Sequence, residues 1–110
     1  MADSVDRADL DESADGSTIA LAVGETRLLV LGERPTTGFS WHATTSNSAV
    51  VVVTATAFRA RSLTPGGGGE RVFTISALTA GSSTVTWAHQ RGSGASGVAD
   101  RRIALTFDVR

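Results

Sequence analysis

Residues 102–109 read Arg-Ile-Ala-Leu-Thr-Phe-Asp-Val, with an apolar side chain at every second position. A period of two is typical of a strand with one buried face, because successive side chains point to opposite sides of a sheet. Residues 71–78 alternate in the same way, with Phe73, Ile75 and Ala77 as the apolar set. These two stretches predict an all-β protein.

We expect further strands at residues 17–23, 26–31, 39–44, 50–59 and 84–89, and no helix. Turn-forming residues separate them at intervals of about eight to twelve positions, a spacing typical of a sandwich or a barrel. The pattern predicts seven or eight strands in two sheets, as in an immunoglobulin-like β-sandwich. The chain has no cysteine and no tyrosine, so neither the antibody-type disulfide nor the tyrosine corner can form. The predicted core comprises Leu21, Val30, Trp41, Phe73, Ile75, Trp87, Leu105 and Phe107.

Charge divides the chain into two parts. Residues 1–16 carry six acidic side chains and one arginine, a net charge of −5, whereas the other 94 residues carry five acids and nine arginines, a net charge of +4. An acidic stretch with few apolar residues is typical of disorder. We therefore expect residues 1–16 to form a disordered acidic tail and residues 17–110 to form one folded domain.

The same composition bears on partners and compartment. The arginines are scattered along the chain, and no apolar run reaches the ~20 residues of a membrane helix, so neither nucleic acid nor membrane is an expected partner. No basic segment followed by an apolar one marks a signal peptide. As written, the chain is expected to be a cytoplasmic monomer, with a periplasmic or secreted protein as the alternative if a leader was removed.

Few residues suggest catalysis or a cofactor. His42 and His89 lie 47 positions apart without clustered carboxylates, which matches no zinc spacing. The glycines before Glu70 lack the Gly-Lys-Ser/Thr ending of a phosphate-binding loop. A Ser–His–Asp arrangement leaves no trace in a sequence, but no nucleophile-elbow motif is present. We interpret both histidines as ordinary strand residues, and expect no enzyme activity, no metal and no cofactor.

Residues 34–41, Arg-Pro-Thr-Thr-Gly-Phe-Ser-Trp, form the most informative segment. Pro35 fixes its own φ and restricts the residue before it, while Thr36 and Thr37 are stiff because they are β-branched. Gly38 permits a positive φ before the next strand. Such a loop loses little entropy on docking and could act as a binding wedge, or it could be an ordinary connection between strands.

This segment resembles the Asn-Pro-Thr-Thr-Gly-aromatic-x-Trp motif of the chagasin family of cysteine-peptidase inhibitors. The run Gly66–Gly69 before a strand is similar to the family's glycine loop, and Arg91 falls where the family has an arginine after its Ala-Gly turn. The resemblance covers roughly residues 17–110.

The resemblance implies an immunoglobulin-like sandwich that inhibits papain-like cysteine peptidases reversibly and without a covalent bond. It implies that Thr36, Thr37 and Gly38 enter the active-site cleft, and that a glycine loop and an arginine-bearing loop flank them. The implied peptidase-binding residues are Pro35, Thr36, Thr37, Gly38, Phe39, Gly66, Gly67, Gly68, Gly69, Arg91, Gly92 and Ser93.

Two positions depart from the family pattern. Arg34 replaces the asparagine before the proline, and Gly92 and Ser93 replace a proline and an aromatic residue. Loss of an aromatic anchor could weaken affinity about 30-fold. The alternative function is therefore a non-inhibitory immunoglobulin-like binding domain that has changed partners.

Overall fold

The computed structural model of the protein describes residues 10–33, 38–60, 68–91 and 98–110. These residues form seven strands and one short 3-10 helix. In chain order the elements are η2 (Glu12–Ala14), β1 (Thr18–Leu21), β2 (Thr26–Glu33), β3 (Phe39–Thr45), β4 (Val51–Ala60), β5 (Gly69–Ala77), β6 (Gly81–Arg91) and β7 (Val98–Val109).

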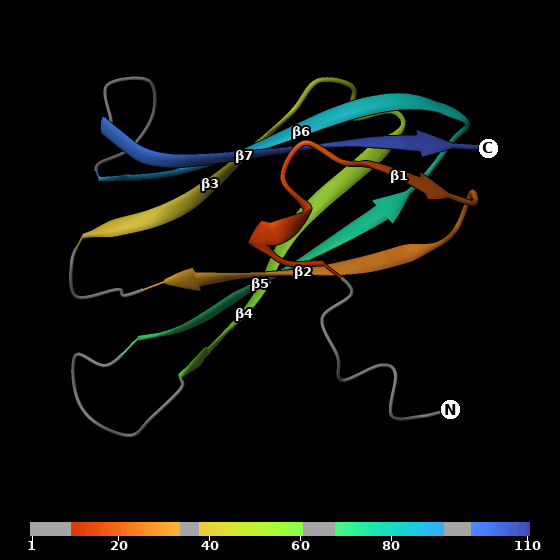
Figure 1. The fold of residues 1–110 in the computed structure, drawn as a ribbon. Helices are drawn as coiled ribbons and strands as arrows, with labels where there is room; N and C mark the ends of the chain where they lie inside the picture. The colour runs from red at the N-terminus through yellow and green to blue at the C-terminus, as the bar shows by residue number, and fades with distance from the viewer. Residues whose placement is uncertain (1–9, 34–37, 61–67, 92–97) are drawn as a thin grey trace.

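The strands form two sheets that pack as a sandwich (Figure 1). One sheet has the order β1-β7-β6-β3, and the other has the order β2-β5-β4. β1 runs parallel to β7, whereas the other neighbouring strands are antiparallel. The chain changes sheets between β1 and β2, between β2 and β3, between β3 and β4, and between β5 and β6. This arrangement confirms the predicted all-β, immunoglobulin-like sandwich without a disulfide.

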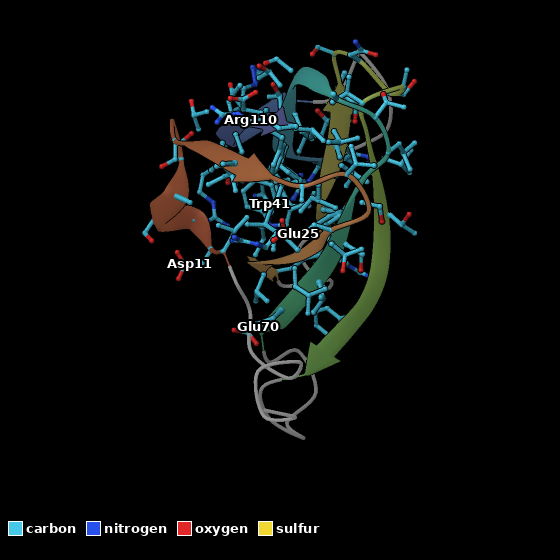
Figure 2. All side chains as sticks on the ribbon, turned by 90° about the vertical axis from the view of Figure 1, so that its right-hand side faces the viewer. Asp11, Glu25, Trp41, Glu70 and Arg110 are labelled. Atoms are coloured by element: carbon cyan, nitrogen blue, oxygen red, sulfur yellow. The ribbon has the colours of Figure 1, made fainter. Side chains whose placement is uncertain are left out.

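The core consists of inward-facing side chains from both sheets. In β7 the apolar residues at alternate positions from Ile103 to Val109 are all buried, as are Phe73 and Ile75 in β5. Figure 2 shows Trp41 in the interior between the sheets. Burial is confirmed for every predicted core residue: Leu21, Val30, Trp41, Phe73, Ile75, Trp87, Leu105 and Phe107.

Several predicted strand limits were wrong. The strand expected over residues 17–23 ends at Leu21, and Val23 is 52% exposed. The reason is a turn in which the Glu25 backbone N–H donates to the Ala22 carbonyl at 2.9 Å. The strand expected to end at residue 31 continues to Glu33, and the strand expected over residues 84–89 is longer, from Gly81 to Arg91.

A segment before β1 closes one side of the sandwich. The Leu10 backbone N–H donates to the Leu28 carbonyl, and the Leu10 carbonyl accepts from the Val30 N–H, both at 3.0 Å. Five residues later, the Asp15 carboxylate accepts a 2.8 Å hydrogen bond from the Ala104 N–H of β7. The segment therefore passes from the edge of one sheet to the other (Figure 1), and Figure 2 places Asp11 at the margin of the sandwich.

This segment differs from the predicted tail. The sequence placed residues 1–16 outside the folded domain, but residues 10–16 hydrogen-bond to both sheets, and Leu10 packs against the core. Residues 1–9 lie outside the described part of the chain. No helix among the described residues is long and apolar enough to span a bilayer.

Candidate functional site

Six strand ends meet at one end of the sandwich, at the left of Figure 1. Glu33 at the end of β2 pairs with Gly69 at the start of β5, which also pairs with the end of β4. In the other sheet, Phe39 at the start of β3 pairs with Arg91 at the end of β6, and Arg91 pairs with Val98 at the start of β7. We call this end the loop end, because the β2–β3, β4–β5 and β6–β7 connections all start and finish there.

Gly38 is the last residue before β3 and has a φ of +81°. This backbone conformation costs free energy for residues with a Cβ atom. The prediction that Gly38 adopts a positive φ before the strand is therefore confirmed. A Cβ atom added here would lie 3.6 Å from Nε of Arg91, which is an ordinary contact distance. The requirement for glycine at residue 38 thus comes from the backbone and not from lack of space.

Three rings stack behind Gly38, and we call Phe39, Trp41 and His89 the ring stack. His89 lies parallel to Phe39 with ring centroids 5.2 Å apart, and tilted against Trp41 with centroids 4.8 Å apart. The guanidinium of Arg91 lies 5.2 Å from the Phe39 ring centroid, and that of Arg101 lies 5.0 Å from the Trp41 ring. These cation–π contacts join the start of β3 to the end of β6 through Arg91 and to β7 through Arg101.

His89 also has a polar partner in β7. Its Nδ1 lies 2.6 Å from Oδ1 of Asp100, and the His89 side chain is 10% exposed. The hydrogen bond from His89 lowers the pKa of Asp100 below its usual value, because it stabilises the carboxylate form. This pair ties the β6 end to the β7 start.

Glu33 is a buried carboxylate at the end of β2, with its side chain only 1% exposed. Its Oε1 accepts hydrogen bonds from Nε and a terminal guanidinium nitrogen of Arg71, at 3.1 and 2.7 Å. Its Oε2 accepts from the backbone N–H of Trp41 at 3.2 Å, across the sandwich. Burial of a carboxylate costs free energy unless such partners satisfy both oxygens.

The structure places some of the predicted site residues and not others. Of the twelve, Gly38, Phe39, Gly68, Gly69 and Arg91 are described, and all five lie at the loop end. The other seven lie outside the described residues: Pro35, Thr36, Thr37, Gly66, Gly67, Gly92 and Ser93.

Sequence reasoning missed the polar residues that support this end. Glu33 and Arg71 lie 38 positions apart, and His89 and Asp100 lie 11 apart. No local motif marks either pair. The one available signal was Glu33 itself, an acidic residue directly after the apolar run of β2.

The histidines do not form a triad with the residues described. Ser40 Oγ lies 3.0 Å from Nε2 of His42, but both alternate with Trp41 in β3 and so face away from His89 and Asp100. The Ser40–His42 pair therefore lies on one face of the sheet and the His89–Asp100 pair on the other, so the serine and the acid do not share a histidine. Among the described residues, no group of three or more potential metal-ligating side chains occurs.

Residues 20–107 match the family described as "Chagasin family peptidase inhibitor I42". The match spans most of the chain, and this protein belongs to the chagasin family. It is therefore a cysteine-peptidase inhibitor of chagasin type and not an enzyme, as the sequence predicted. No match was found among curated proteins.

Solved structures share the fold at low sequence identity. The cysteine protease inhibitor EhICP2 from Entamoeba histolytica is 18% identical, with a TM-score of 0.78 over 92% of this chain and 93% of that one. Amebosin is 24% identical, with a TM-score of 0.72 over 92% and 97% of the two chains. PbICP-C, solved in complex with falcipain-2, is 15% identical, with a TM-score of 0.62 over 94% and 92%. These likenesses establish the fold.

Proposed function

We propose that this protein inhibits papain-like cysteine peptidases reversibly, without forming a covalent bond, by presenting its three loop-end connections to the active-site cleft. The single observation that carries the proposal is the convergence of six strand ends at the loop end. A partner that approaches this end can meet all three connections at once.

The role of each connection follows from its residues. The β2–β3 connection, with Pro35, Thr36, Thr37 and Gly38, would enter the cleft as a stiff wedge. Such a wedge fills a groove made for extended peptide backbone, yet it need not offer a carbonyl carbon to the thiolate. Reversible inhibition without cleavage would result.

The other two connections would contact the walls of the cleft. The β4–β5 connection contains Gly66, Gly67, Gly68 and Gly69, which have no side chains, so the backbone of this connection would approach the enzyme closely. The β6–β7 connection would contribute Arg91, with Gly92 and Ser93. A three-loop contact of this kind would bury about 1,600 Å² in total.

The nature of the partner is supported by the named relatives. EhICP2 is described as a cysteine protease inhibitor, and PbICP-C was solved bound to falcipain-2. We propose that a single copy of this chain binds a single peptidase of the same class, because the loop end presents one set of three connections.

The test is a titration of papain with the purified protein in a fluorogenic peptide assay. We expect inhibition that is lost on dilution, and mass spectrometry should show neither an adduct nor a cleaved chain. Unchanged papain activity at about 10 µM inhibitor, a concentration typical of weak specific binding, would instead support the non-inhibitory binding domain.

A further inference from the structure

We infer that Glu33 and Arg71 are positioning residues, which set the affinity for the peptidase by holding two of the three connections in their binding geometry. The inference rests on the proposed function and adds residues that do not themselves contact the enzyme. It starts from the burial of Glu33 at the last position of β2.

Glu33 ties together the two strands that flank the β2–β3 connection. Its carboxylate accepts from the Trp41 backbone N–H at 3.2 Å, and the Trp41 indole Nε1–H donates to the Gly32 carbonyl at 2.8 Å. Gly32 and Glu33 belong to one sheet and Trp41 to the other. Two hydrogen bonds therefore fix the distance between the sheets directly behind the proposed wedge.

Arg71 extends the same network to the β4–β5 connection. It lies in β5, two residues after Gly69, and its guanidinium is 5.2 Å from the ring centroid of Phe58 in β4. Arg71 and Phe58 are also register partners in the sheet. One guanidinium thus contacts β2 through Glu33 and β4 through Phe58, at the base of the glycine loop.

The chemistry of the pair makes it sensitive to substitution. Removal of Arg71 would leave the buried Glu33 carboxylate with the Trp41 N–H as its donor. The free-energy cost of this loss is large enough to make the end of β2 rearrange. A wedge that spends a tenth of its time in the binding geometry binds about tenfold more weakly. Once bound, the peptidase would itself hold the wedge in place. We therefore expect most of the loss of affinity to appear as slower association.

The chain contains a matched control pair at the opposite end of β2. Arg27 Nε lies 3.2 Å from Glu25, and its side chain is 32% exposed, against 31% for Arg71. Arg27 lies in register with Ile75, far from Gly69 along β5. Substitution of Arg27 therefore removes an arginine of similar exposure, paired with a glutamate that is 37% exposed where Glu33 is 1% exposed, at a position away from the loop end.

The experiment compares papain inhibition constants and association rates for the parent, Arg71→Met, Glu33→Gln and Arg27→Met. We expect about a tenfold increase in Ki for the first two variants, carried by slower association, and no change for Arg27→Met. Arg71→Lys keeps the charge but loses the planar group, so its Ki should fall between parent and Arg71→Met. The Ki of the variant that combines Glu33→Gln with Arg71→Met should be no higher than that of the weaker-binding single variant, because both substitutions break the same network.

Thermal unfolding of each variant separates positioning from stability. Parental Ki for folded Arg71→Met and Glu33→Gln, or an equal loss for Arg27→Met, would overturn the inference and leave the proposed function intact. If Glu33→Gln or Arg71→Met does not fold, Arg71→Lys is compared with Arg27→Met and the parent. A parent protein that does not inhibit papain would overturn the proposed function, and the inference with it.

Discussion

At the scale of single residues, Gly38 gives the sharpest test of the proposed wedge. Its φ of +81° suits glycine, and a Cβ atom there would meet Arg91 only at ordinary contact distance. Gly38→Val would therefore shift the backbone of the connection without a clash. A positive φ costs a residue with a Cβ atom about 1–2 kcal/mol, so we expect Ki for papain to rise about tenfold.

Gly24 provides the matched control for this variant. It has a φ of +89° with no atom within 4 Å of an added Cβ, and it lies in the turn between β1 and β2, away from the loop end. Gly24→Val should therefore lower the melting temperature by a similar amount and leave Ki unchanged. Equal inhibition by Gly38→Val and the parent would show that the β2–β3 connection is not the wedge.

Asp100 offers a pH test at the same scale. The hydrogen bond from His89 lowers the pKa of Asp100 below its usual value, so the carboxylate form is favoured in the folded state. A carboxyl group with a lowered folded-state pKa adds stability that is fully present above its unfolded pKa and is lost as the pH falls through its folded pKa.

We therefore expect Asp100→Asn to be less stable than the parent at about pH 5, with the difference shrinking toward about pH 1. Thermal unfolding across this range would measure it. A difference that stays constant or grows on acidification would contradict the assigned hydrogen bond. Asp108→Asn, which removes an ion pair whose arginine is 81% exposed, should change the stability little.

At the scale of elements, the segment before β1 is the feature that the sequence did not reveal. Residues 10–16 connect the edge strand β2 to β7, and Leu10 packs against the core. The segment also covers part of the β2 edge, where unpaired backbone groups would otherwise be open to other chains. Its role is therefore structural: it pairs with the middle of β2 and β7, and Glu12 accepts a 2.8 Å hydrogen bond from Arg101, whose guanidinium lies over the Trp41 ring.

Two truncations test this role. A chain that starts at residue 17 should lose about 2 kcal/mol of unfolding free energy relative to one that starts at residue 10, mainly from the packing of Leu10. Chemical denaturation would measure the difference, and both chains should give the same Ki for papain. Equal stability of the two chains would mean that the segment contributes nothing to the folded domain.

At the scale of the whole molecule, the sandwich could be predicted because its strands carry local signals. The alternation in β5 and β7 fixes which side of each strand is buried, and Trp41 and Trp87 mark the centre of the core. These signals depend on neighbouring residues alone. They were sufficient for the fold class and for the predicted core.

Other features could not be predicted because they depend on contacts between distant residues. Gly32 and Glu33 look like turn formers, yet β2 continues through them because β5 pairs with them and Arg71 neutralises the buried acid. Leu10 is the single large aliphatic residue among several acids, and its burial depends on the edge of β2. Likewise, the motif identified the candidate wedge, whereas the residues that support it became evident only in three dimensions.

The central claim is that the loop end occupies the active-site cleft of the peptidase. Its most direct test is calorimetric binding of the protein to free papain and to papain whose cleft is filled by an irreversible peptide-like inhibitor. We expect binding to the free enzyme and none to the filled one. Binding to both forms with the same affinity would contradict this claim.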